Sequence, residues 1–130
     1  METNPKPIFL LLVGVLAGII CGFSIQGQQV KTPPGYLITE AEITDPAAVR
    51  TYGDKLAETL APFNHHYVVR TSKIQALEGD APKSRVVIIA FDSVAKAREW
   101  YDSPAYAAIR PIRQNAAKAR IYIVEGLAPQ

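Results

Sequence analysis

The chain has 130 residues, which is enough for one domain, and 20% of its residues are charged. The formal net charge is only +2, and the basic residues are scattered along the chain, which argues against a nucleic acid as a partner. The single cysteine, Cys21, lies near the N-terminus. The rest of the chain contains no cysteine, which excludes an internal disulfide, a CxxC redox centre and a cysteine nucleophile there.

Residues 8–25 form an uncharged apolar run. It is long for the core of a signal peptide and short for a membrane span, which needs about 20 residues. Small residues at Gly22 and Ser24 fit cleavage after Ser24, an uncleaved anchor is the alternative, and Cys21 raises lipid attachment as a third. We expect a signal peptide or membrane anchor over residues 1–27, a linker over residues 28–34 and a folded domain over residues 35–127. All three alternatives place the domain in the periplasm or on the outer side of the cytoplasmic membrane, with the membrane contacted only through the N-terminal segment.

The domain is predicted to begin with a strand over residues 35–43, whose two faces alternate. Asp45 then suits the cap of a helix and Pro46 its first position. An apolar stripe that runs from Val49 to Phe63 at spacings of three and four residues indicates that this helix packs on the core.

A second strand is predicted over residues 65–79, with a bulge near Thr71, and a third over residues 84–91. A second helix follows Asp92 or Ser93 and restarts at the Ser-Pro step of residues 103–104. A fourth strand is predicted over residues 120–127. The order β-α-β-β-α-β is that of a ferredoxin-like α+β fold, a four-stranded antiparallel sheet with both helices on one face.

The third strand is apolar on both faces: Val86 and Ile88 point one way, and Val87 and Ile89 the other. The helices can cover only one face, and a sheet with a wet face should alternate apolar and polar residues. A few hundred Å² of bare apolar sheet represents several kcal/mol at about 25 cal/mol per Å². We therefore predict a homodimer in which two sheets pack face to face.

Three stretches of the domain, "GYLITEAEITDPAAVRTY", "YVVRTSKIQALEGDAPKSRVVIIAF" and "AREWYDSPAYAAIRPIRQNAAKARIYIVEG", resemble the family catalogued as domain of unknown function 1330. The resemblance covers about residues 35–126. That family is similar to the dimeric α/β-barrel proteins, which include cofactor-free monooxygenases, isomerases and haem-binding members. The resemblance implies a dimer with a cavity between each sheet and its helices or its partner, and it implies no particular reaction.

The segment "EWYDSPAYAAIRPIRQ" holds a concentration of aromatic and basic residues. One interpretation is a ligand pocket, and the other is a junction of two helical pieces filled by aromatic rings. The candidate ligand-binding residues here are Trp100, Tyr101, Tyr106 and Arg113. Arg113 lies on an apolar face, where a guanidinium either binds the carboxylate of a ligand or pairs with a neighbouring Asp or Glu.

A second group of candidates lies on the sheet. Glu40 shares the face of Tyr36 in the first strand, and Arg70 of the second strand is the expected cross-sheet partner of Glu40. The functional interpretation is a polar pocket in which Glu40 acts as a base and Arg70 stabilises an anionic intermediate. The alternative is a structural ion pair.

His65 and His66 would point to opposite faces of a strand, so they do not indicate a metal site, and no motif for a cofactor is present. Three functions from different classes stay open. The first is an exported dimer that binds a small aromatic or anionic molecule. The second is a cofactor-free enzyme, similar to monooxygenases or isomerases, that uses Glu40 and Arg70. The third is a structural or stress-related module without a ligand.

Overall fold

A computed structural model describes residues 31–130. The predicted leader, residues 1–27, and the first part of the predicted linker lie outside the described residues. Within residues 31–130, no helix has the length and apolar character needed to span a membrane.

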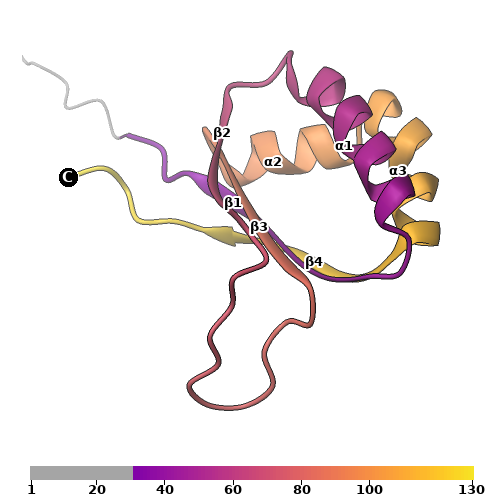
Figure 1. Cartoon of the computed structure of the whole chain (residues 1–130). Helices are drawn as coiled ribbons and strands as arrows, with labels where there is room; N and C mark the ends of the chain where they lie inside the picture. Colours follow the sequence, from indigo (N-terminus) through magenta and orange to yellow (C-terminus); the bar gives the residue numbers. More distant parts are fainter. Residues whose placement is uncertain (1–30) are drawn as a thin grey trace, which may run out of the picture.

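Seven elements follow one another along the chain (Figure 1). In order they are β1 (Gly35–Ile43), α1 (Pro46–Leu60), β2 (His65–Thr71), β3 (Arg85–Phe91), α2 (Val94–Tyr101), α3 (Pro104–Ala116) and β4 (Ala117–Glu125).

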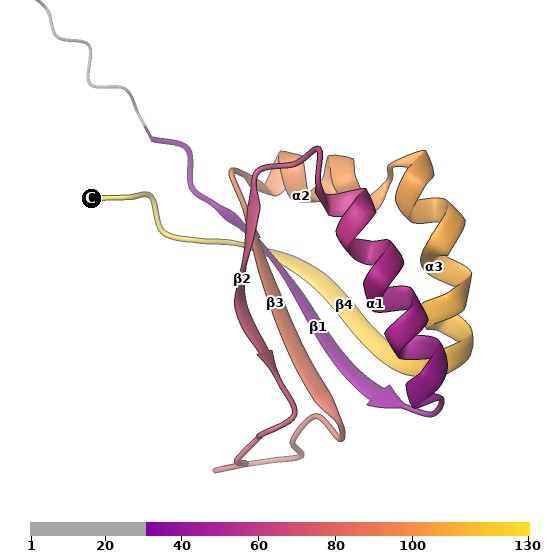
Figure 2. The same ribbon diagram turned by 45° about the horizontal axis from the view of Figure 1, so that its top comes forward.

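The strands form one antiparallel sheet in the order β2-β3-β1-β4, and the helices lie together on one side of it (Figure 2). The central strands are thus the first and the third in the chain, and β2 and β4 form the edges. This arrangement confirms the predicted ferredoxin-like fold.

The helix starts follow the predicted capping residues. The side chain of Asp45 accepts hydrogen bonds from the backbone N–H groups of Ala47 and Ala48, each at 3.1 Å, at the start of α1. Ser93 caps α2, and Ser103 accepts from the N–H of Tyr106 at 3.2 Å. The second predicted helix is therefore divided into α2 and α3 at the Ser-Pro step, as expected.

The second strand differs from its prediction. It ends at Thr71 rather than at residue 79, because β3 begins only at Arg85 and the intervening residues 72–84 have no strand opposite them. These residues form a loop that extends beyond the end of the sheet (Figure 1). The bulge lies between Tyr67 and Val69 rather than near Thr71. The fourth strand likewise begins earlier than predicted, because Ala117 already pairs with Ile43 of β1.

The core lies between the sheet and the helices. Its buried members come from β1, β3 and all three helices: Leu37, Leu60, Ile89, Phe91, Ala97, Trp100 and Tyr106. Trp100 is 1% exposed, stacks on Phe91 with ring centroids 5.7 Å apart, and donates its indole N–H to Thr59 Oγ1 at 3.1 Å. The helical junction is thus anchored by the only tryptophan of the chain.

The other side of the sheet carries no helix (Figure 2). We call it the outer face, and its apolar side chains on β1, β3 and β4 are Tyr36, Ile38, Val86, Ile88, Ala90, Tyr122 and Val124. Tyr122 and Val124 are both 39% exposed. An apolar surface of this kind is typical of an interaction site.

Replacement of glycine by alanine is expected to have opposite effects on stability at two positions, Gly35 and Gly53. A Cβ at Gly35 would lie 2.5 Å from the Ser93 carbonyl oxygen and 2.6 Å from Val94 Cα, so the backbone would have to move. Gly53 lies inside α1, where the nearest atom to a Cβ is 4.0 Å away. Gly35→Ala should lower the free energy of unfolding by about 1–3 kcal/mol, whereas Gly53→Ala should raise it by up to about 1 kcal/mol. Urea unfolding of both variants measures the difference, and an equal response of the two would contradict the close β1–α2 contact.

Candidate functional site

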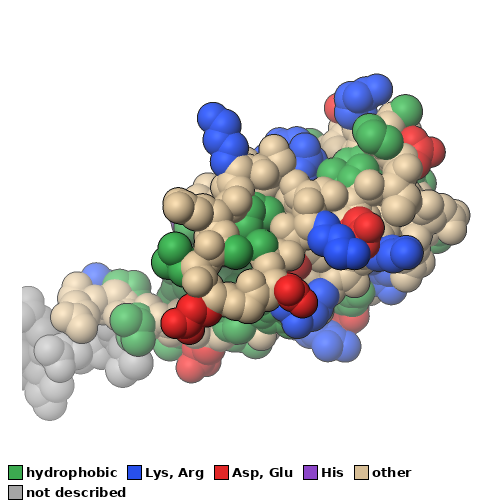
Figure 3. Space-filling view, turned by 60° about the horizontal axis from the view of Figure 1, so that its bottom comes forward, with side chains coloured by type: hydrophobic (Ala, Val, Ile, Leu, Met, Phe, Trp, Pro, Cys, Tyr) green, Lys and Arg blue, Asp and Glu red, His purple; other side chains and the backbone are tan. Residues whose placement is uncertain are grey.

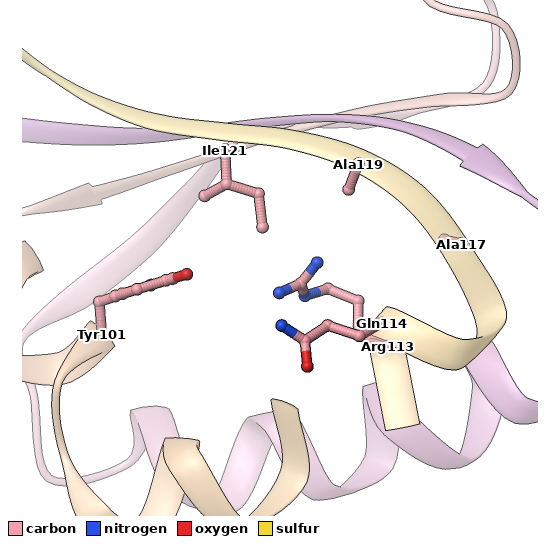
Figure 4. Close-up of a pocket in the computed structure, with 6 residues that line it drawn as sticks. All are labelled: Tyr101, Arg113, Gln114, Ala117, Ala119 and Ile121. Atoms are coloured by element: carbon pink, nitrogen blue, oxygen red, sulfur yellow. The ribbon is translucent and has the colours of Figure 1, made fainter. Parts of the chain in front are cut away.

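A pocket of about 330 Å³ lies between the helices and the helix-facing side of β4 (Figure 4). We call it the α3–β4 pocket. Its lining comes from the end of α2, the end of α3 and the first half of β4, and consists of Tyr101, Arg113, Gln114, Ala117, Ala119 and Ile121.

Small side chains keep this pocket open. Ala117 and Ala119 alternate with outer-face residues on β4, so both methyl groups point toward the helices. The larger Ile121 closes the pocket further along the strand. Larger side chains at the two alanines would fill the space between β4 and α3 with protein atoms.

Arg113 is the only charged residue that lines the α3–β4 pocket. Its side chain is half-buried, and its Nε donates to the hydroxyl of Tyr106 at 3.3 Å. Among residues 31–130, no carboxylate lies within 4 Å of this guanidinium. A partly buried cation without an acidic partner favours binding of an anion from solution.

Arg110 fixes the opposite wall of the pocket. Its guanidinium lies over the ring of Tyr101, 4.5 Å from the centroid, and over that of Tyr106 at 5.2 Å. One of its Nη groups also donates to the Tyr101 carbonyl oxygen at 2.6 Å. These contacts hold the Tyr101 ring where Figure 4 shows it, with the hydroxyl directed toward Arg113.

The Tyr106 hydroxyl belongs to a short chain of polar groups under the pocket. It lies 3.1 Å from the hydroxyl of Tyr52 in α1, and Tyr106 itself is 1% exposed. Burial, and next the phenol of Tyr106, raise the pKa of Tyr52 far above its usual value, while the positive charge of Arg113 acts in the opposite direction. Tyr52 therefore stays protonated at any physiological pH.

The structure separates the candidates of the aromatic segment into two groups. Trp100 and Tyr106 are core residues with ring centroids 4.2 Å apart, and they fill the junction between α2 and α3. Tyr101 and Arg113 line the α3–β4 pocket together. Trp100 and Tyr106 thus fit the interpretation as a helical junction filled by aromatic rings, and Tyr101 and Arg113 fit the interpretation as a ligand pocket.

The expected pairing of Glu40 with Arg70 is wrong. Glu40 lies on the outer face and accepts from Arg120 of β4, with 2.6 Å between Oε2 and the nearer Nη, and from the Tyr122 hydroxyl at 3.4 Å. Arg70 pairs in register with Val87, which packs against the core, so Arg70 points to the helix side. The bulge in β2 causes this, because one extra residue reverses which face the following side chains occupy.

The other outer-face candidate, Tyr36, packs away from the α3–β4 pocket. A Cβ at Gly126 would overlap the Tyr36 ring, which shows how closely the ring covers the end of β4. A second hollow of about 250 Å³ lies near Glu40 and Arg120, where the β2–β3 loop meets the sheet. Its lining carries charges of both signs, with Glu42 paired to Lys83 at 3.3 Å.

Sequence reasoning missed Tyr52, Gln114 and Ile121 as parts of the site. Tyr52 lies within the apolar stripe from Val49 to Phe63, which indicates only packing on the core, and its hydroxyl contact with Tyr106 spans 54 positions of sequence. Gln114 follows Arg113 directly, so the sequence signal for Gln114 is a pair of polar residues at the end of a helix, next to a candidate site residue. Within residues 31–130, no group of three or more His, Cys, Asp or Glu side chains is placed to hold a metal ion.

Basic and acidic side chains lie next to one another on the face of the molecule shown in Figure 3, with hydrophobic side chains between them. Helix α2 carries two exposed ion pairs, Lys96 with Glu99 at 2.7 Å and Arg98 with Asp102 at 2.6 Å. Such exposed pairs contribute little to stability. They contrast with Arg113, which forms no ion pair with a carboxylate in the described part of the chain.

The chain is similar to several solved structures. RPA0582, a protein of unknown function from Rhodopseudomonas palustris, has a TM-score of 0.60 at 22% identity, with 75% of this chain and 85% of that chain covered. SnoaB, a cofactor-independent oxygenase from Streptomyces nogalater, has a TM-score of 0.55 at 15% identity, with 76% of this chain and 96% of that chain covered. A dimeric ferredoxin-like protein of unknown function from Thermobifida fusca has a TM-score of 0.52 at 15% identity, with 75% and 95% covered. These likenesses show the fold.

No curated protein matches the chain. The model of one family matches residues 34–127, which is nearly the whole folded domain, and its description is "Domain of unknown function (DUF1330)". This chain therefore belongs to the DUF1330 family.

Proposed function

We propose that this protein binds a small anionic or aromatic molecule in the α3–β4 pocket. The observation that carries the proposal is the Arg113 guanidinium, which lines the pocket and has no carboxylate partner among the described residues. A bound anion would supply the missing partner through charge-assisted hydrogen bonds. Tyr101 and Ile121 form the part of the lining that the body of the molecule would contact.

The alternatives have less support. A purely structural module does not account for an open pocket whose cation has no carboxylate partner among residues 31–130. An enzyme that uses Glu40 and Arg70 would need both groups in one site, and they lie on opposite faces of the sheet. SnoaB is an oxygenase, but its likeness to this chain extends to the fold.

Removal of the Arg113 charge tests the proposal. Benzoate and phenyl phosphate are titrated into the full-length chain by calorimetry, and we expect at least one of them to bind. Arg113→Ala should then weaken that binding at least about tenfold, since hydrogen bonds to a charged group contribute roughly 1.5–3 kcal/mol. Arg98→Ala is the matched control, because Arg98 lies on α2 and pairs with Asp102. Failure of both probes to bind, or equal binding by the two variants, would refute the proposal.

We further propose that the protein is a homodimer in which the outer faces of two copies pack together. The support is the apolar outer face, which no helix of this chain covers, and the fold shared with the dimeric protein from Thermobifida fusca. Two-fold packing of equivalent sheets would bury this face on both subunits.

Export of the domain is also a proposal, and its support is the uncharged run at residues 8–25. Fractionation of the producing cells should place the protein in the periplasm or on the outer side of the cytoplasmic membrane. The intact mass should show cleavage after Ser24 or, for an anchor, the complete chain. Recovery of the protein from the cytoplasmic fraction alone would overturn this proposal.

A further inference from the structure

We propose that the α3–β4 pocket selects a monocarboxylate attached to a single flat ring, and that the Tyr106 hydroxyl is the positioning group that presents both Nη atoms of Arg113 to the carboxylate. This inference rests on the proposed binding function and names the class of ligand that the same site takes. Three features of the structure lead to it: the hydrogen bonding of Arg113, the charge of the lining and the shape of the lining.

The hydrogen bonding of Arg113 determines which edge of its guanidinium is free. The Nε group donates to Tyr106 Oη at 3.3 Å, so the side of the guanidinium that carries Nε is occupied by the protein. The two Nη groups extend into the space between Gln114 and Ile121 (Figure 4). A carboxylate has two oxygens at the spacing of these two groups, and can therefore pair end-on with both.

The charge of the lining favours a single negative charge on the ligand. Arg113 is the only charged member of the lining, and its nearest basic neighbour on the helix, Arg110, is held over the Tyr101 ring and donates to a backbone carbonyl. A dianion such as a phosphate monoester would bring a second charge with no cation to meet it. Burial of an unpaired charge is costly, so the dianion should bind more weakly.

The shape of the lining favours a flat body. The volume of about 330 Å³ is close to the lower end of the range for ligand pockets, roughly 300–1,000 Å³. Ile121 and Ala119 approach from the sheet, and the Tyr101 ring closes the side opposite Arg113 (Figure 4). A single ring would contact the isoleucine and the tyrosine while its carboxylate reaches Arg113.

The Tyr106 hydroxyl is suited to hold Arg113 because it cannot move freely. Its ring packs against Trp100 and against Tyr101, with centroid separations of 4.2 Å and 5.3 Å. The Tyr52 hydroxyl, which stays protonated, meets it at 3.1 Å. A buried acceptor fixed in this way restricts the rotamers of the long arginine side chain before the ligand arrives, which lowers the entropic cost of binding.

A panel of probes tests the ligand class. Benzoate, benzamide, acetate and phenyl phosphate are titrated into the full-length chain at pH 8, where the phosphate ester is a dianion. We expect benzoate to bind at least about tenfold more tightly than neutral benzamide, because the charged partner of Arg113 is lost. Acetate, which lacks the ring, and phenyl phosphate should also bind at least about tenfold more weakly.

Two tyrosine variants test the positioning role. Tyr106→Phe keeps the ring and should reduce the benzoate-to-phenyl phosphate affinity ratio about fivefold or more, because a mobile guanidinium accepts both anions. A merely structural loss would weaken both probes alike and leave the ratio unchanged. Tyr36→Phe is the matched control on the outer face and should leave the ratio at the wild-type value. Tyr52→Phe leaves the Tyr106–Arg113 bond in place and should lower the ratio less than Tyr106→Phe.

The outcomes separate this inference from the function on which it rests. If phenyl phosphate binds as tightly as benzoate and Arg113→Ala loses the binding of both probes, the preference for a carboxylate is overturned. The proposal that the pocket binds an anion would still stand. An unchanged ratio in a folded Tyr106→Phe would overturn the positioning role. If Tyr106→Phe does not fold, Tyr52→Phe decides, because an unchanged ratio in that variant contradicts the role of the hydroxyl chain.

Discussion

Trp100→Ala is expected to lower the free energy of unfolding by about 3–5 kcal/mol, the largest effect on stability of any substitution considered for this chain. The side chain is 1% exposed and lies between Phe91 of the sheet and Tyr106 of α3, so its removal leaves a cavity at the centre of the core. The indole N–H bond to Thr59, which connects α2 to α1, is lost at the same time. Small domains have a total stability of about 5–15 kcal/mol, so the variant should be marginally folded.

Two further variants make the Trp100 prediction specific. Trp100→Phe keeps an aromatic ring and removes the N–H donor, and should therefore cost less than the alanine variant. Leu77→Ala removes a large apolar side chain that is 88% exposed in the loop between β2 and β3, and should change stability by less than about 0.5 kcal/mol. Urea unfolding, followed by circular dichroism, compares all three. A loss in Trp100→Ala as small as that in Leu77→Ala would show that the tryptophan does not anchor the helical junction.

Ile38→Glu is expected to convert the proposed homodimer into single chains. Ile38 pairs with Ile88 on one side and with Tyr122 on the other, which places it at the centre of the outer face. A carboxylate there would be buried without a partner, at a cost of several kcal/mol. Two-fold symmetry places two such groups in the interface, and every 1.4 kcal/mol weakens association about tenfold.

Sedimentation of the full-length chain at micromolar concentration measures this effect. The wild type should sediment as a pair, and Ile38→Glu as one chain. Val94→Glu is the matched control, because Val94 is 36% exposed at the start of α2, away from the outer face, and a negative charge suits a helix N-terminus. A wild type that sediments as one chain, or an Ile38→Glu variant that stays paired, would contradict the sheet-to-sheet dimer.

The sequence predicts the elements well because alternation and capping are local signals. Asp45 and Ser103 act as caps in the structure as their positions indicated, and the apolar third strand is central in the sheet. The extent of β2 was not predictable in the same way. Its apolar pattern continues beyond Thr71, and the end of the strand depends on where β3 begins, which is a property of the pairing.

The candidate site likewise depends on how distant parts of the chain come together, which local sequence patterns do not reveal. Arg113 could be recognised as a cation on an apolar face, but its lack of an acidic partner depends on where every carboxylate of the domain comes to lie. Glu40 and Arg70 illustrate this, because a single bulged residue between Tyr67 and Val69 places them on opposite faces. The pocket itself depends on Ala117 and Ala119, whose small size becomes visible as empty space only when β4 is set against α3.

Both ends of the described chain leave the sheet at the same end of the strands (Figures 1 and 2). The N–H of Gly126 donates to the Pro34 carbonyl oxygen at 2.8 Å, whereas the α3–β4 pocket lies around Ala117 and Ala119 at the opposite end of β4. The separation along the strand is on the order of 20 Å. Attachment of the protein to a sensor chip or a resin through an affinity tag after Gln130 therefore leaves the entrance of the pocket facing the bulk solution.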